Sequence, residues 1–130
     1  MRKKTRVLIV DDDPNLSRLS GMILENSGQY EVLTENNAGR ALLVARQFRP
    51  DVMLFDVDMP TKSGGDLAGE AASDPVLRHV PILFVTGLIS KAEAGDRQVD
   101  CGGLHFLAKP VTPERLLESV GKLAVSTAIA

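Results

Sequence analysis

The chain has 130 residues, of which 44% are hydrophobic and 25% are charged, and its formal net charge is −2. These proportions are typical of one soluble globular domain and exclude a disordered chain, a collagen-like repeat and a disulfide scaffold. The charge argues against direct nucleic-acid binding by this segment, and the short apolar runs argue against a membrane span or a signal peptide. We therefore expect a cytoplasmic protein. The single cysteine, Cys101, excludes an internal disulfide.

The first predicted strand covers residues 6–10 (RVLIV), a continuous apolar run typical of a strand buried on both faces of a parallel sheet. A helix is predicted to follow, with Asp13 as its N-cap, Pro14 at its first position and Gly28 beyond its end. Its buried face is expected to consist of Leu16, Leu19, Ile23 and Leu24. Residues 30–34 (YEVLT) are a weaker apolar segment, as an edge strand would be.

The second predicted helix has small and apolar residues at helical spacing and ends before Pro50. These residues are Ala38, Ala41, Leu42, Ala45 and Phe48. A second strand of the buried type is predicted at residues 51–55 (DVMLF). The third helix is predicted around residues 66–72, where Ser63 and Asp66 have the spacing of a capping box.

The third buried strand is predicted at residues 81–85 (PILFV). A fourth helix is predicted from Ser90 and should be the least stable, because it contains Gly95 and offers few apolar residues for burial. Those residues are Ala92, Ala94 and Val99. Residues 104–108 (LHFLA) are predicted to form the other edge strand, and the last helix begins at Thr112.

Five strands that alternate with five helices predict a doubly wound α/β domain. Such a domain is a three-layer sandwich, in which a parallel five-stranded sheet lies between helices and the crossovers are right-handed. A (βα)8 barrel is excluded because it would need about twice this length. We expect the domain to cover residues 1–124, with a C-terminal tail or the start of a linker at residues 125–130.

Polar residues follow these strands at the carboxyl edge of the sheet, where open α/β sheets bind their ligands. Asp11 and Asp12 follow the first strand, Asp56 the third, Thr86 the fourth and Lys109 the fifth. Carboxylates about 5 Å apart would repel by roughly 3 kcal/mol per pair at an effective dielectric constant of 20. A cation is therefore expected there. Mg²⁺ suits an all-oxygen site, and Lys109 supplies a second positive charge.

Four blocks of the sequence resemble the receiver domain of two-component response regulators. They are VLIVDDDP at 7–14, MLFDVDMPTKSGG at 53–65, ILFVTG at 82–87 and HFLAKP at 105–110. The blocks occur in the family's order, and the resemblance covers about residues 5–124. It implies a flavodoxin-like fold of the chemotaxis-regulator type, with the strand order 2-1-3-4-5.

The resemblance also implies a function. Asp56 would accept a phosphoryl group from a phosphohistidine of a sensor histidine kinase or a histidine phosphotransfer protein, with Lys109 paired to the phosphoryl oxygen. The metal, Mg²⁺ or alternatively Mn²⁺, would be held by Asp12 directly, by Asp11 through bound water, by Asp56 and by the backbone carbonyl of Asp58. The chain would then be a signalling phosphoacceptor that assists only its own phosphorylation and dephosphorylation, and not an enzyme.

Thr86 and Phe106 resemble the family's switch pair, in which the threonine turns toward the phosphoryl oxygen and the aromatic ring follows. Phe106 stands where the family often has tyrosine. The surface expected to change consists of the fourth helix, the last strand and the last helix, where a second copy of the domain or a downstream effector would bind. Pro110 stands where the family usually has a cis peptide bond after the lysine.

Two other functions compete with this interpretation. A haloacid-dehalogenase-like phosphohydrolase would use Asp56 as nucleophile and Asp58 as general acid, but the order of the motifs and the chain length disagree with that family. A receiver-like interaction module that never meets phosphate would be expected to have lost some of Asp12, Asp56 or Lys109. Turnover of a phosphomonoester would indicate the hydrolase, whereas a stoichiometric, acid-stable and base-labile label would indicate the receiver.

Overall fold

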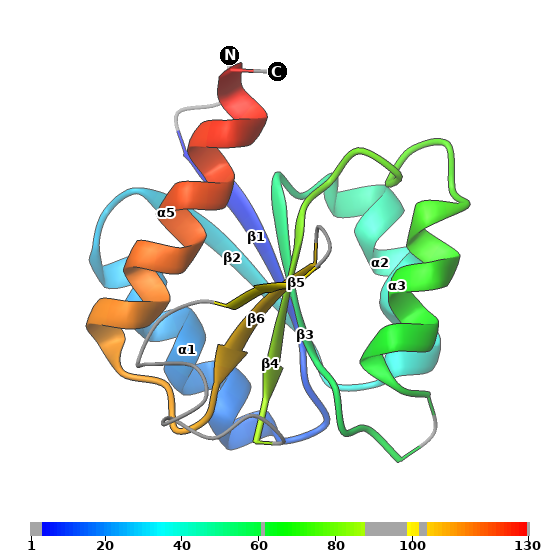
Figure 1. The fold of residues 1–130 in the computed structure, drawn as a ribbon, viewed down its shortest axis with the longest axis horizontal. Coiled ribbons are helices and arrows are strands. Elements are labelled where there is room, and N and C mark those ends of the chain that lie inside the picture. Colours follow the sequence, from blue (N-terminus) through cyan, green and yellow to red (C-terminus); the bar gives the residue numbers. More distant parts are fainter. Residues whose placement is uncertain (1–3, 61, 88–98, 102–103, 130) are drawn as a thin grey trace.

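The computed structural model describes residues 4–60, 62–87, 99–101 and 104–129. One six-stranded sheet lies between two layers of helices (Figure 1). A 3-10 turn, η1 (Ala38–Arg40), precedes the second helix. The remaining elements are β1 (Thr5–Val10), α1 (Pro14–Asn26), β2 (Tyr30–Glu35), α2 (Ala41–Phe48), β3 (Val52–Asp56), α3 (Gly64–Ala72), β4 (Ile82–Thr86), β5 (Val99–Cys101), β6 (Leu104–Ala108) and α5 (Pro113–Ile129).

The five predicted strands are confirmed within one or two residues, and so is their order. The sheet runs β2-β1-β3-β4-β6-β5, and β2, β1, β3, β4 and β6 pair in parallel. β1 and β3 are central and buried on both faces, which explains their nearly continuous apolar sequences. The predicted doubly wound α/β fold is therefore correct.

The prediction is wrong at β5. Val99 was expected to lie in the fourth helix, but Val99–Cys101 is a strand that pairs antiparallel with β6. The rest of that predicted helix lies outside the described residues. The pair Cys101↔Leu104 leaves two glycines between the strands, a sequence that favours a tight hairpin. The segment 104–108 was predicted to be an edge strand, but β6 lies inside the sheet, and β5 forms this edge.

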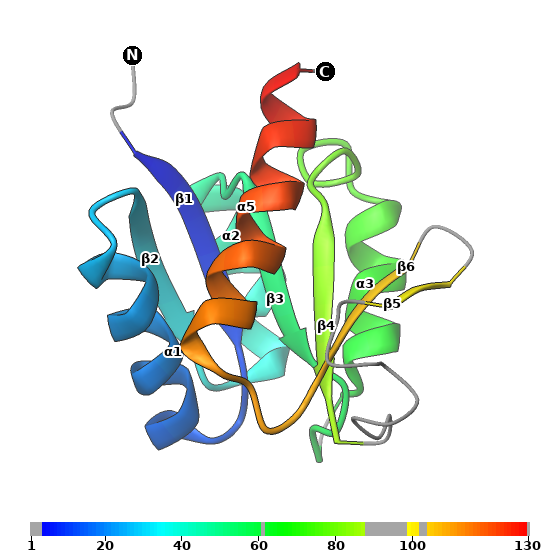
Figure 2. The same ribbon diagram turned by 60° about the vertical axis from the view of Figure 1, so that its left-hand side comes forward.

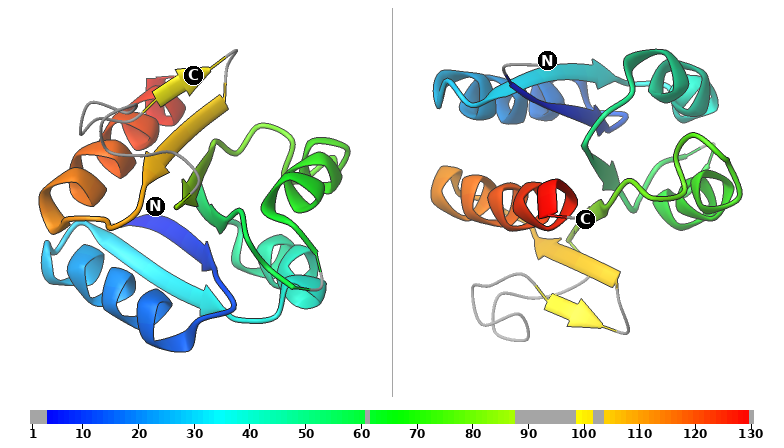
Figure 3. Two further views of the ribbon diagram at one scale, coloured as in Figure 1. Left: turned by 60° about the horizontal axis from the view of Figure 1, so that its bottom comes forward. Right: turned by 90° about the horizontal axis from the view of Figure 1, so that it is seen from above.

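Figures 2 and 3 show the sheet and its two layers of helices from other sides. Two apolar cores fill the spaces between these layers. α2 and α3 cover one face of the sheet, where Met53 and Phe55 of β3 are buried. α1 and α5 cover the other face, where Leu54 of the same strand packs with Leu116 and Val120 of α5. Successive residues of β3 thus enter opposite cores, and this fixes the direction in which Asp56 leaves the strand.

The predicted buried face of α1 is partly wrong. Leu24 is fully buried as expected, but Leu16 and Leu19 are 43% and 55% exposed, and the other residues buried on this helix are Ser17 and Gly21. A Cβ atom at Gly21 would lie 3.3 Å from Cγ1 of Val32. Small residues therefore let α1 lie close to β2, and this close approach turns the two leucines outward.

The ends of the helices follow their sequence signals in most places. The Asp13 side chain caps α1, and Ser63 Oγ accepts the backbone N–H of Asp66 at the start of α3, both as predicted. The last helix, α5, continues to Ile129, into the residues expected to form a C-terminal tail or the start of a linker. No glycine or proline follows residue 121 to end it. Among the described residues, no helix has the length and apolarity that a membrane crossing requires.

Candidate functional site

The acidic residues predicted at the carboxyl edge of the sheet do come together. Asp11 and Asp12 follow β1, Asp56 ends the neighbouring strand β3, and Val10 pairs with Phe55 just before them. One carboxylate oxygen from each of the three lies within 4.8 Å of the others. Asp11 and Asp56 are buried, at 7% and 5% exposure, whereas Asp12 is exposed. The site is therefore a half-buried acidic cluster that is open on the side of Asp12.

Lys109 brings a cation to this cluster from the far side of β4. Its Nζ lies 3.2 Å from Oδ1 of Asp56. The lysine follows β6 directly, its backbone N–H donates to the carbonyl of Thr86 at 2.9 Å, and its peptide bond to Pro110 is cis, as the resemblance implied. One ammonium faces three carboxylates, so the site retains an excess of negative charge. Its all-oxygen donors fit Mg²⁺ or Mn²⁺.

The electrostatics of the cluster are most evident at Asp11. The pKa of the Asp11 carboxyl is raised from 3.8 to about 6. Burial is the largest cause, and repulsion from Asp56 adds to it. The backbone N–H of Asp13, which donates to Asp11 Oδ1 at 2.9 Å, and the charge of Lys109 lower the pKa but do not cancel these effects. The carboxylates of the ionised cluster therefore repel one another, and a bound cation would reduce this repulsion.

This raised pKa predicts a pH dependence of stability without metal. A carboxyl whose pKa is higher in the folded state holds its proton more tightly there, so stability is lost as pH rises from about 4 to about 6. Asp11→Asn should remove that contribution and leave the variant more stable than the wild type at pH 7 in a chelator. Urea unfolding at several pH values measures it. Parallel pH profiles for the two proteins would contradict the prediction.

Asp13 has the structural role predicted for it and not a place in the cluster. Its Oδ1 accepts the backbone N–H groups of Asn15 and Leu16 at 3.0 and 3.3 Å. This engages the carboxylate at the N-terminus of α1, where a negative charge is favourable. Asp11 and Asp12 are therefore the two acids of the Asp11–Asp13 triplet that serve the site.

Of three further predicted residues, Asp58 and Thr86 lie near Asp56, whereas Phe106 packs against the core. Asp58 is exposed, and its backbone N–H donates to Oδ1 of Asp56 at 3.3 Å. Thr86 is 2% exposed and lies one residue beyond Val85, the β4 partner of Asp56. Phe106 does not touch the cluster and lies half-buried against the core on the α2–α3 face. Its ring stacks on Phe84 with the ring centroids 5.2 Å apart.

Sequence reasoning missed two residues that support the cluster. Asn36, which follows β2, donates from its side-chain amide to the backbone carbonyl of Asp11. Gly64, the first residue of α3, lies so close to Asp56 that an added Cβ would be 2.5 Å from the Asp56 carbonyl oxygen. The glycine pair at residues 64–65 was a visible signal for a close approach, whereas the contact of Asn36 depends on tertiary structure alone.

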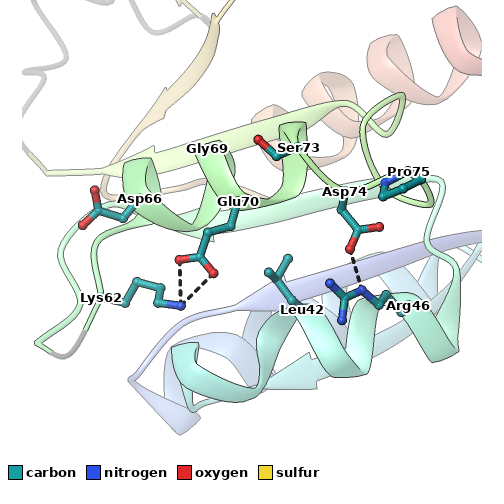
Figure 4. A pocket seen from close by; sticks show the side chains of 9 residues that line it. All are labelled: Leu42, Arg46, Lys62, Asp66, Gly69, Glu70, Ser73, Asp74 and Pro75. Carbon is teal, nitrogen blue, oxygen red and sulfur yellow. Dashed lines mark hydrogen bonds and ion pairs between the residues drawn. The ribbon is translucent and has the colours of Figure 1, made fainter.

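A second charged hollow lies between α2 and α3, away from the acidic cluster (Figure 4). Lys62 Nζ pairs with Glu70 at 2.8 Å, and Arg46 pairs with the buried carboxylate of Asp74. Asp74 also accepts the N–H of Val76, and both partners lower its pKa. The Arg46–Asp74 pair joins α2 to the segment after α3, and the Lys62–Glu70 pair joins α3 to the loop before it. The hollow is therefore explained by packing and is not a candidate for the chemistry.

Residues 7–121 match the family model of the response regulator receiver domain. This chain belongs to that family. The receiver is 36% identical to PilH of Pseudomonas aeruginosa over 118 residues, which is 88% of this chain and 93% of that protein. It is 32% identical to the polar-differentiation response regulator DivK of Brucella anthropi, over 88% of this chain and 91% of the relative.

Solved structures agree with this assignment. The receiver superposes on the chemotaxis protein CheY4 of Vibrio cholerae with a TM-score of 0.78 and 30% identity, covering 92% of this chain and 98% of that one. A response regulator receiver domain protein of Methanospirillum hungatei gives a TM-score of 0.79 at 28% identity, over 96% and 97% of the two chains. The family and the CheY-like fold predicted from the four sequence blocks are thus confirmed.

Proposed function

We propose that this receiver accepts a phosphoryl group on Asp56 from a sensor histidine kinase or a histidine phosphotransfer protein, in a reaction that depends on Mg²⁺. The observation that carries the proposal is the contact of Lys109 Nζ with Asp56 Oδ1 at 3.2 Å, within a cluster of three carboxylates. This arrangement unites a nucleophile with the positive charge that phosphoryl transfer needs.

The chemistry follows from these groups. An oxygen of Asp56 attacks the phosphorus, the phosphorus–nitrogen bond of the phosphohistidine breaks, and its electron pair returns to the imidazole as the acyl phosphate forms. Lys109 neutralises charge on the transferred phosphoryl group. Asp11, Asp12, the Asp56 carboxylate and the backbone carbonyl of Asp58 would hold Mg²⁺ or Mn²⁺. When bound, the ion would supply further positive charge to the transferred phosphoryl group.

A labelling experiment tests the proposal. The receiver is incubated with acetyl phosphate or phosphoramidate and Mg²⁺, and the expected product is one acid-stable, base-labile phosphoryl group per chain. A phosphate-independent module would take up no label under these conditions. Continuous turnover of a phosphomonoester would instead indicate the haloacid-dehalogenase-like hydrolase, with Asp58 as its acid, and would show that the protein is an enzyme.

The surface beside the cluster suggests where a protein donor binds. An apolar groove between α1 and α5 is lined by Leu16, Leu19 and Ile23 on one side and Pro110 and Val111 on the other, and it reaches Asp11 and Lys109. A helix that carries the phosphohistidine could fill this groove with its apolar face and present its ring to Asp56. The outward leucines of α1 then have a binding role.

This docking model predicts that a substitution in the groove slows phosphorylation by a protein donor but not by a small-molecule donor. Leu19→Glu should slow phosphotransfer from the partner protein by about tenfold or more, because a central apolar contact becomes a buried charge. Labelling by acetyl phosphate should be unchanged. Leu43→Glu is the matched control, since Leu43 is 54% exposed on α2, on the opposite face. Equal rates for the two variants with the protein donor would argue against the groove.

We propose that Thr86 transmits the phosphorylated state. The acyl phosphate presents strong acceptor oxygens, so the Thr86 hydroxyl gains a charge-assisted hydrogen bond by turning toward them. Phe106, already half-buried on Phe84, adjusts to that movement. The predicted output surface consists of the fourth helix, the last strand and the last helix. Of these, the structure describes the last strand, β6, and the last helix, α5, while residues 88–98 lie outside the described part. A second copy or an effector would bind at this surface.

Thr86→Ala should keep the Asp56 label while losing transmission. The expected result is a normal yield of acyl phosphate, with phosphorylation-induced amide shifts in β6 and α5 that are markedly smaller than in the wild type. Thr86→Ser retains the hydroxyl and should preserve them. NMR spectra of the three phosphorylated proteins make the comparison, and identical shifts in the alanine variant would show that the hydroxyl is not needed.

A further inference from the structure

Asn36, the residue directly after the neighbouring strand β2, is hydrogen-bonded to the acidic loop between β1 and α1. Its side-chain Nδ2 donates to the backbone carbonyl of Asp11 at 2.9 Å and to Ser17 Oγ, also at 2.9 Å. Ser17 is 2% exposed and in turn donates to the carbonyl of Pro14. One amide group therefore donates to the backbone just before Asp12 and to a side chain at the start of α1, after Asp12.

A backbone hydrogen bond from the end of β2 also holds Asp11. The backbone N–H of Asp11 donates to the carbonyl of Glu35 at 3.2 Å, which extends the β1–β2 pairing by one residue. Both the N–H and the carbonyl of Asp11 are thus bonded to the end of β2. The Asp11 backbone lies in a fixed place although the strand has ended.

The loop needs such support because its own charges oppose it. The carboxylates of Asp11, Asp12 and Asp56 have oxygens within 4.8 Å of one another. Among the described ion pairs, Lys109 is paired with Asp56 and with no other acid of the cluster. Repulsion in this cluster favours a loop that moves outward and separates the acids. If the loop were free to move, cation binding would have to bring the acids back together, and the free energy this costs would lower the affinity for the cation.

We infer that Asn36 is a positioning residue for the metal site, which keeps the Asp11–Asp12 backbone in the conformation that binds a divalent cation. The inference rests on the proposed Mg²⁺-dependent function. The side-chain hydrogen bonds described for Asn36 go to the Asp11 carbonyl and to Ser17 Oγ, so Asn36 acts through the backbone of Asp11 and not as a metal ligand. Residues that orient metal ligands commonly change metal affinity by 10–100-fold when removed, and one uncharged clamp belongs at the lower end of that range.

The next residue in the chain provides a matched control. Asn37 is also exposed, and its Oδ1 accepts the N–H of Gly39 at 2.9 Å as the cap of η1. The hydrogen bonds that the structure describes for Asn37 join it to Glu35, Gly39 and Arg40, within its own loop. Asn36→Ala and Asn37→Ala therefore remove the same side chain from adjacent exposed positions, and only the first releases the acidic loop.

The experiment is a titration with MgCl₂ alone, followed by the NMR amide signals of Asp12 and Asp13, in the wild type, Asn36→Ala, Asn37→Ala and Asp12→Ala. We expect Mg²⁺ affinity to fall about tenfold in Asn36→Ala, less than twofold in Asn37→Ala, and beyond measurement in Asp12→Ala. Amide exchange at Asp12 and Asp13 should be faster in Asn36→Ala. Its labelling rate with acetyl phosphate should return to the wild-type value at saturating Mg²⁺.

The outcomes distinguish two failures. If the wild type binds Mg²⁺ and Asn36→Ala binds it equally well, the positioning role is wrong while the metal site stands. If the wild type shows no saturable change at Asp12 and Asp13, the proposed metal site itself fails, and the role of Asn36 fails with it. A deficit in labelling that persists at saturating Mg²⁺ would also overturn the inference, because the defect would then not be one of metal affinity.

Discussion

Asp56→Asn is expected to abolish phosphoryl labelling. The substitution keeps the shape of the side chain at the end of β3 but replaces the nucleophilic carboxylate with an amide, which does not form a stable acyl phosphate. The position is 5% exposed and lies in the acidic cluster, and among the described residues the ion pair of Lys109 is with Asp56. Mass spectrometry after treatment with acetyl phosphate and Mg²⁺ measures the loss.

Asp58→Asn is the control for this result. Asp58 lies on the same loop, is exposed, and is proposed to serve through its backbone carbonyl, so its variant should still be labelled in full. A label that survives in Asp56→Asn at another residue would refute the assignment of the phosphoacceptor. Loss of activity toward phosphomonoesters in both variants would point to the hydrolase, in which both carboxylates act.

Much of this site could be predicted because it depends on the ends of buried strands. β1 and β3 are apolar runs that each stop at an aspartate, and parallel strands bring such residues to one edge of the sheet. Lys109 is predictable for the same reason, since it follows β6 directly. The Asp13 cap of α1 joins residues that are two and three positions apart, and such local interactions can be predicted from the sequence.

What could not be predicted depends on distances between elements. The leucines of α1 have helical spacing, yet Gly21 and Ser17 face the sheet because α1 lies close to β2. Periodicity gives a stripe of apolar residues but does not say how near the helix comes. β5 was missed because three residues carry little periodic signal, and because its place in the sheet depends on antiparallel pairing with β6.

Gly64 shows how such a distance controls the chemistry. It is the buried first residue of α3, and its backbone N–H donates to the carbonyl of Val57 at 3.2 Å. A Cβ atom there would lie 2.5 Å from the Asp56 carbonyl oxygen and 3.1 Å from the Asp56 carbonyl carbon. Those atoms belong to a strand paired with β4 and cannot move aside as a flexible side chain would. The start of α3 is thus packed directly behind the phosphoacceptor.

Gly64→Ala should therefore destabilise the receiver by about 1–3 kcal/mol and slow phosphorylation of Asp56, because the end of β3 must shift relative to Lys109. Gly69→Ala is the matched control: Gly69 lies in the same helix with no atom within 4 Å of an added Cβ. That variant should gain up to about 1 kcal/mol from the higher helix propensity of alanine and keep its labelling rate. Urea unfolding and the rate of labelling by acetyl phosphate give both quantities. If the two alanine variants behaved alike, the close contact behind Asp56 would have no part in placing it.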